Sequence, residues 1–292
     1  MASNQKANGQ HQGIYAQEIG DINQFLRHDF KGLEPRKNWN FSPAKIDNSQ
    51  DHIVVIIGNR NYKDGVPLVH YAHNDAKAMR EFFTHSLQIP KENILYYEDA
   101  SKGDFEGIFK ARLPNRVKAG KTHLWVYYTG HGLPVDGDAK LLPVDSRPDT
   151  AAYTGYSRAQ LLADLKPLDA AQTTLILDAC FTGISAGANL LPGAKALYRR
   201  VTDFTPPQNG LIISAAKAEE ASWMDDGHEL SLMTLYLLEG LSGKADDNQN
   251  NIITSHELQA YLDKTVPQAA LRLYNQAQNP QIIGKRRDVI EY

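Results

Sequence analysis

The chain has 292 residues, of which 42% are hydrophobic, so it can bury the core of one large α/β domain or of two small ones. Its net charge is −3 with no block of like charges, which argues against nucleic acid or an anionic membrane as the main partner. A single cysteine excludes an internal disulfide and zinc sites built from several thiolates. The chain holds no apolar segment typical of a secretory signal and no run of about 18 apolar residues, so we expect a cytoplasmic protein that does not span a membrane.

The first 50 residues read as an N-terminal extension. Residues 1–13 are polar and rich in Gln, Asn and Gly, which favours disorder. Residues 14–30 carry apolar side chains at helical spacing, and residues 31–52 hold the Gly and Pro residues of a linker or surface wrap. We therefore predict an extension over 1–50, with a regulatory partner as one role for it, and a folded domain over 51–292.

Strands and helices alternate through the rest of the chain. Short apolar, β-rich runs predict strands at His52 to Asn59, Asn93 to Glu98, His123 to Thr129, Thr174 to Leu177, Gly210 to Ser214 and Gln281 to Ile283, with a short extended piece at Lys140 to Val144. Periodic apolar residues predict helices at Ala76 to Thr84, Phe105 to Ala119, Ser157 to Leu165, Glu229 to Leu241 and Ser255 to Thr265.

Nearly all-apolar strands that alternate with helices are typical of a parallel sheet covered on both faces. In such sheets the active site lies outside the carboxyl ends of the strands. His131 and Cys180 each follow such an end, at YYTGHG (Tyr127 to Gly132) and LDACFTG (Leu177 to Gly183). If the third and fourth strands pair side by side, as sequential strands often do, these two residues become neighbours.

A cysteine beside a histidine can form a nucleophilic dyad, because the imidazole can take the thiol proton and deliver it to a leaving amine. The N–H groups of Gly132 and Cys180 are then candidates for an oxyanion hole. Two other interpretations stay open at this point: a lone cysteine is often a small buried hydrophobe, and a histidine between glycines can be a turn residue without a role.

These two segments resemble the caspase and metacaspase family of cysteine peptidases. His131 precedes Cys180 by 49 residues (180 − 131), and the spacing in caspases is about 50. HNDAKAMREFF (His73 to Phe83) resembles the family's first helix, and GLIISAAKAEEASW (Gly210 to Trp223) resembles the first strand and substrate-binding loop of its small subunit. The resemblance implies a caspase-like three-layer sandwich with a mostly parallel sheet of about six strands, His131 as general acid/base and Cys180 as nucleophile.

The resemblance also bears on substrate preference. Caspases that cut after aspartate carry Gln two residues before the cysteine and an Arg on the substrate loop, whereas this chain has Asp178 and Ser222-Trp223-Met224. Metacaspases, which cut after Arg or Lys, carry Asp at the position of Asp178, and a carboxylate pocket should bind a cation. The substrate-binding residues implied in this way are Asp178, Asp75, Ser214, Ser222 and Trp223. The alternative interpretation of Asp75, which is equally supported, is an N-cap of the first helix together with Asn74.

The subunit pattern of caspases maps onto a large-subunit-like part to about residue 189, a linker over about 190–208 and a small-subunit-like part from about 209. Caspases are cut at this linker on activation. Lys195, Arg199 and Arg200 in the 190–207 loop suit the implied pocket, so self-cleavage is one hypothesis and an uncut surface loop is the other.

Residues 246–257 (DDNQNNIITSHE) fit the spacing of an EF-hand calcium loop. The ligands in that pattern are Asp246, Asn248, Asn250, Thr254 and Glu257. The loop has few acids, which weakens calcium affinity, and the alternative is a polar turn with Ser255 capping the next helix. We predict no required cofactor, with calcium as a candidate ligand.

The leading hypothesis is a cysteine endopeptidase that cleaves proteins or peptides after Arg or Lys, with a role in cell death or defence as a family-level expectation. The alternatives are a catalytically silent caspase-fold scaffold and a cysteine amidase that acts on a small substrate.

Overall fold

The computed structural model describes residues 41, 43–45, 51–135, 137–181, 184–185, 188–189, 206–207, 209–285 and 287–292. The chain divides into two compact units. One unit comprises Asn38–Asp225 and Glu229–Tyr292, and the other comprises Met1–Lys37 with Asp226–His228. All of the elements below belong to the first unit.

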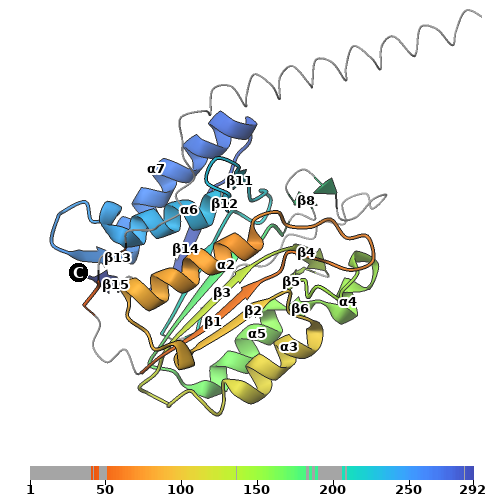
Figure 1. Cartoon of the computed structure of the whole chain (residues 1–292), viewed down its shortest axis with the longest axis horizontal. Coiled ribbons are helices and arrows are strands. Elements are labelled where there is room, and N and C mark those ends of the chain that lie inside the picture. The colour runs from red at the N-terminus through yellow and green to blue at the C-terminus, as the bar shows by residue number, and fades with distance from the viewer. Residues whose placement is uncertain are drawn as a thin grey trace, which may run out of the picture. The chain divides into compact units, whose positions relative to one another are not determined.

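A six-stranded sheet forms the centre of the described chain, with strand order β14-β10-β7-β3-β1-β2 (Figure 1). Its strands are β1 (His52–Gly58), β2 (Ile94–Glu98), β3 (His123–Thr129), β7 (Gln172–Asp178), β10 (Gly210–Ser214) and β14 (Gln281–Gly284). Every pair is parallel except β10 with β14 at one edge. The predicted fold class is confirmed, because β1, β3, β7 and β10 are buried apolar runs between two helical layers.

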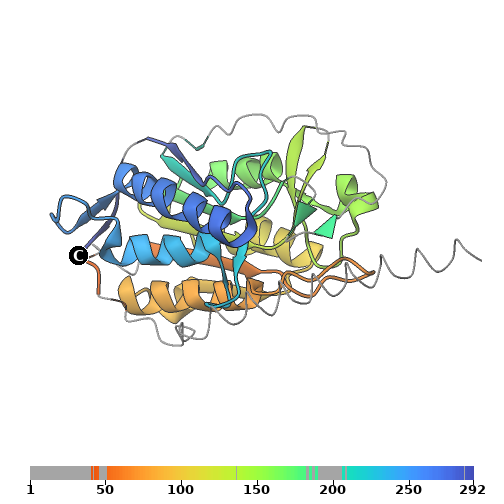
Figure 2. The same ribbon diagram turned by 90° about the horizontal axis from the view of Figure 1, so that it is seen from above.

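Helices cover both faces of this sheet (Figures 1 and 2). One hydrophobic cluster joins the sheet to α2 (Ala72–Glu81), α6 (Leu232–Glu239) and α7 (Ser255–Tyr274). A second cluster joins the opposite face to α3 (Lys102–Glu106) and α5 (Arg158–Leu165). Alternate residues of each strand enter the two clusters, as the period-2 geometry of a strand requires.

Smaller elements lie around the central sheet. They are β4 (Gly132–Val135), β5 (Asp138–Leu141), α4 (Ala151–Thr154), β6 (Tyr156–Ser157), β8 (Ile184–Ser185), β9 (Ala188–Asn189), β11 (Met224–Asp225), β12 (Leu230–Ser231), β13 (Ile252–Thr254) and β15 (Asp288–Glu291). The extended piece expected at Lys140 to Val144 overlaps β5, which pairs with β4 and β6 in a separate small sheet.

Two helices begin earlier than predicted. Asn74 and Asp75 are not N-caps: α2 begins earlier, at Ala72, and both lie in its first turn. The predicted helix from Phe105 begins instead at Lys102, because Ser101 forms a capping box with Asp104.

Two helices also end elsewhere than expected. The helix predicted to reach Ala119 ends in a π-helical stretch at Arg112, before Pro114, whose ring and missing N–H oppose continuation. The last helix, α7, continues past Thr265 to Tyr274 although Pro267 lies inside it. Its N-cap is Thr254 rather than Ser255, with Glu257 completing a capping box.

Candidate active site

The pairing of β3 with β7 brings the two reactive candidates together. Thr129 is in register with Asp178, and His131 and Cys180 each follow two residues later. Gly132 lies against the strand end of Cys180: a Cβ on this glycine would stand 2.7 Å from the Cys180 carbonyl oxygen and from the Phe181 ring. The expectation from the sequence that the strand before His131 pairs with the strand before Cys180 is therefore confirmed.

The His131 imidazole is held by a backbone carbonyl. Its Nε2 lies 2.6 Å from the carbonyl oxygen of Pro67, which assigns the proton to Nε2 and a lone pair to Nδ1. Burial lowers the pKa of His131 to about 4, against the opposing effect of the Pro67 oxygen, so the ring is neutral near pH 7. Nδ1 is buried and has no hydrogen-bond partner among the described residues. A buried basic nitrogen without a partner is costly in a structural role.

Two tyrosine hydroxyls fix the backbone of His131. Its N–H donates to Tyr62 Oη (2.7 Å), and Tyr128 Oη donates to its carbonyl oxygen (2.7 Å). The Tyr62 ring also lies 4.6 Å from the imidazole, centroid to centroid. Gly130 has φ +155°, and both hydroxyls would lie 2.7 Å from a Cβ there, so only glycine fits between them.

Cys180 is 3% exposed and contacts the loop over residues 215–223, which we call the 215–223 loop. The backbone N–H of Ser222 donates to Sγ, and Sγ lies 3.6 Å from the Ser222 carbonyl oxygen. The nucleophile candidate is therefore covered by the backbone of Ser222, through both its N–H and its carbonyl group.

Asp178 and Asp75 form a buried carboxyl pair, 4% and 1% exposed. Ser231 joins them, because its N–H donates to Asp75 (2.9 Å) and its hydroxyl donates to Asp178. Burial raises the pKa of Asp75 well above its usual range, and the charge of Asp178 raises it further. Burial also raises the pKa of Asp178. Among the described residues, neither carboxyl forms an ion pair with a cation.

Three hydroxyls donate to Asp178 and oppose the effect of burial. They belong to Ser222 (3.0 Å), Thr234 (2.9 Å) and Ser231, which also caps α6 through the Thr234 N–H (3.0 Å). Ser222 therefore touches both Asp178 and Cys180. The sequence indicated Ser222, but it did not single out Ser231 or Thr234.

Of the other two implied substrate residues, Ser214 immediately precedes this loop and Trp223 is its last residue. Ser214 is buried at the end of β10, in register with Leu177 of β7. Trp223 stacks on Tyr274 with ring centroids 4.6 Å apart. Lys195, Arg199 and Arg200 lie outside the described residues.

The candidate calcium loop is closed by its own hydrogen bonds. Asp246 accepts from the N–H groups of Asn250 (3.1 Å) and Asn251 (2.8 Å), and the amide of Asn248 donates to Glu257. Asn251 has φ +64°, as the glycine position of the pattern requires. The described residues contain no group of three or more His, Cys, Asp or Glu side chains arranged to hold a metal ion.

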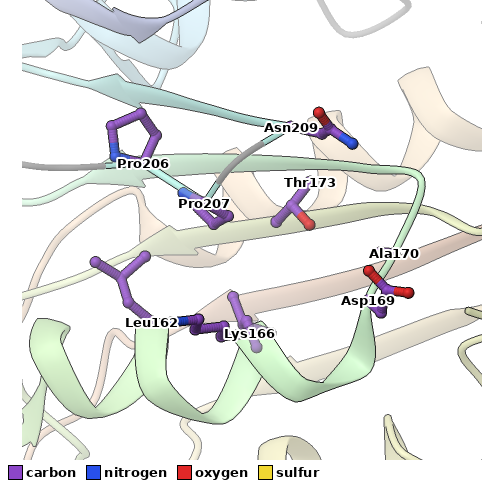
Figure 3. Close-up of a pocket in the computed structure, with 9 residues that line it drawn as sticks. Leu162, Lys166, Asp169, Ala170, Thr173, Pro206, Pro207 and Asn209 are labelled. Atoms are coloured by element: carbon purple, nitrogen blue, oxygen red, sulfur yellow. The ribbon is translucent and has the colours of Figure 1, made fainter. Parts of the chain in front are cut away.

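A cavity of about 580 Å³ lies at the opposite end of the sheet from Cys180 (Figure 3). Thr173 at the start of β7 and Asn209 just before β10 line it, together with Leu162, Lys166 and Pro207. None of the predicted site residues lines this cavity, so it is not the candidate active site.

No helix within the described ranges has the length and apolar character needed to cross a bilayer.

The chain is similar to one known family over most of its length. A comparison with curated proteins gave no match. The family model of the caspase domain, a peptidase family, matches residues 51–289. With a six-stranded α/β sandwich that brings His131 beside Cys180, the chain belongs to the caspase-domain family of cysteine peptidases.

Proposed function

We propose that the protein is a cysteine endopeptidase that cleaves its protein substrates after Arg or Lys, with Cys180 as nucleophile and His131 as general acid and base. The observation that carries the proposal is the buried Nδ1 of His131, which has no hydrogen-bond partner among the described residues and lies on the strand end next to Cys180. The neutral imidazole is in the protonation state that a general base needs.

In this mechanism, Sγ attacks the scissile carbonyl carbon while Nδ1 takes the thiol proton. The imidazolium that forms is stabilised by the bond from Nε2–H to the Pro67 oxygen, which strengthens when the ring is charged. The N–H groups of Gly132 and Cys180 stabilise the oxyanion. Nδ1–H then protonates the leaving amine, and water hydrolyses the thioester to release the acid and the thiol.

The preference for Arg or Lys rests on the pair Asp75 and Asp178. Two buried carboxyls cannot both ionise cheaply without a nearby cation, and a substrate guanidinium or ammonium supplies one. The hydroxyl of Ser222 connects this pair to the loop that covers Cys180, which supports a substrate cation bound close to the nucleophile.

A panel of fluorogenic peptides that differ only in the residue before the scissile bond tests the proposal. We expect cleavage after Arg and Lys, none after Asp or Gln, and no cleavage of any peptide by Cys180→Ala or His131→Ala. Cleavage after Asp would contradict the assigned pocket. If wild type cleaves no peptide, the proposal fails in favour of a scaffold or of an amidase.

Self-processing in the 190–207 loop is part of the proposal, because Lys195, Arg199 and Arg200 suit the same pocket. Wild type and Cys180→Ala incubated side by side should differ: fragments ending at one of these residues should form only in wild type. Fragments in both samples would point to a contaminating protease, and an intact wild type would refute self-processing.

A further inference from the structure

The buried side chain of Gln278 forms hydrogen bonds with both ends of the 215–223 loop. This residue follows α7 and is 0% exposed. Its Oε1 accepts the Trp223 N–H (2.9 Å), and its Nε2 donates to the Ala215 carbonyl oxygen (3.0 Å) and lies 3.5 Å from Ser222 Oγ. One amide thus connects the first residue of the loop to its last two.

This set of partners requires a carboxamide. The side chain must offer an acceptor to Trp223 and a donor to Ala215, and Gln supplies both from one planar group. Met supplies neither at comparable length. An ionised Glu keeps the acceptor but places a negative charge against the Ala215 oxygen.

We propose that Gln278 is a positioning residue for the reaction, because it fixes Ser222 in contact with both Cys180 and Asp178. The Ser222 N–H meets Sγ, and the Ser222 hydroxyl meets the Asp178 carboxyl at 3.0 Å. Among the described residues, Gln278 is hydrogen-bonded to neither Cys180 nor Asp178, and it acts on both through Ser222. The effect on catalysis rests on the proposed function, whereas the effect on the contact between Ser222 and the Cys180 thiol does not.

A neighbouring residue provides a matched control. Asn279 holds the same loop through Glu220, by its N–H (2.6 Å) and its Nδ2 (2.6 Å), and within the described ranges it is hydrogen-bonded to neither Ser222 nor Trp223. Asn279→Ala removes the Nδ2 bond and keeps the backbone bond. It reports what a general loosening of the loop costs.

The experiment compares wild type, Gln278→Met, Gln278→Glu and Asn279→Ala in three measurements. These are kcat and KM on a peptide with Arg before the scissile bond, the rate of Cys180 alkylation by iodoacetamide, and the thermal unfolding temperature. For Gln278→Met we expect a loss in kcat/KM of about 10²-fold, since a displacement of about 1 Å has this effect. Alkylation should become faster, because the Ser222 backbone that covers Sγ is released.

Damage to the fold would also expose the buried Cys180 and speed its alkylation. Slower catalysis with faster alkylation therefore supports positioning only when the unfolding temperature of Gln278→Met is no lower than that of Asn279→Ala. Gln278→Glu should regain activity relative to wild type as pH falls, because a protonated carboxyl can donate to the Ala215 oxygen. Equal effects in Gln278→Met and Asn279→Ala, or unchanged alkylation in Gln278→Met, would overturn the inference. If wild type cleaves no peptide, the alkylation rates still decide the role of Gln278.

Discussion

The carboxyl pair formed by Asp75 and Asp178 should exchange a proton for the substrate cation. Their pKa values are raised by burial and, for Asp75, by the charge of Asp178, so in the free protein the pair retains a proton at a pH where an exposed carboxyl is ionised. A guanidinium that enters the pocket favours the ionised pair and expels this proton. Below the raised pKa, affinity should therefore rise about tenfold, or about 1.4 kcal/mol, for each unit of increasing pH.

The same raised pKa fixes the sign of the effect on stability. The protonated pair stabilises the empty fold at low pH, and this contribution is lost as pH rises through the raised pKa. A bound cation should thus raise the unfolding temperature more at high pH than at low pH.

Binding of benzamidine to Cys180→Ala measures the exchange without turnover. Calorimetry in two buffers of different ionisation enthalpy, across about pH 5 to 8, should give release of close to one proton per bound cation on the acidic side. In Asp75→Asn/Cys180→Ala, proton release should fall, because only Asp178, raised by burial, remains. Affinity at high pH should fall by about 2–5 kcal/mol, the range for truncating one partner of a buried charge pair.

Benzamide, the neutral analogue, is the control for the ligand and should show no pH dependence. A benzamidine affinity that is flat across this range would refute the reasoning. Unchanged proton release in the Asp75→Asn protein would also refute it, because the proton would then belong to another group.

Three further outcomes are expected. Burial lowers the pKa of His52 from 6.5 to about 4, so the stability that depends on neutral His52 is complete above pH 6.5 and is lost as pH falls toward 4. Between neutral pH and about pH 5, the free energy of unfolding measured by chemical denaturation should fall by about 2 kcal/mol more in wild type than in His52→Gln. An equal fall in both proteins would contradict this. Gly132→Ala should cost about 1–3 kcal/mol of stability and most of the activity because its Cβ meets the Cys180 carbonyl, whereas Gly107→Ala, whose Cβ meets nothing within 4 Å, should cost neither. If the 246–257 loop takes calcium, the Kd by calorimetry should be about 10⁻⁴–10⁻³ M and Glu257→Gln should abolish the signal; no signal in wild type would leave the loop a polar turn.

The placement of Cys180 and His131 could be predicted because both follow apolar strands of a parallel sheet, where strand ends meet at one edge. The supports of the pair could not be predicted in the same way. The Pro67 group that orients His131 is a backbone carbonyl, which leaves no side-chain signature. Gln278 lies in a polar stretch where nothing in the local pattern indicates burial.

Asp75 illustrates how the structure can exclude one of two local interpretations. The sequence left it as either an N-cap or a pocket acid. The helix begins at Ala72, which rules out the cap, and the Ser231 N–H reaches its carboxyl from a part of the chain 156 residues away. The contact depends on how β12 and α2 pack together, which periodicity along one segment does not encode.

The register between β3 and β7 has a consequence for how this chain tolerates changes in length. Both reactive residues lie two positions past one aligned pair, Thr129 and Asp178, so their proximity does not depend on the path that the backbone takes between them. Doubling a flexible connection costs only about 0.6 kcal/mol in closure entropy, whereas deleting one residue inside β7 turns its remaining side chains to the other face. Insertions in the exposed turns between β4 and α5 should leave the chemistry intact. The interval of 49 residues between His131 and Cys180 thus reflects the length of the connection between the two strands, and the reaction does not require it.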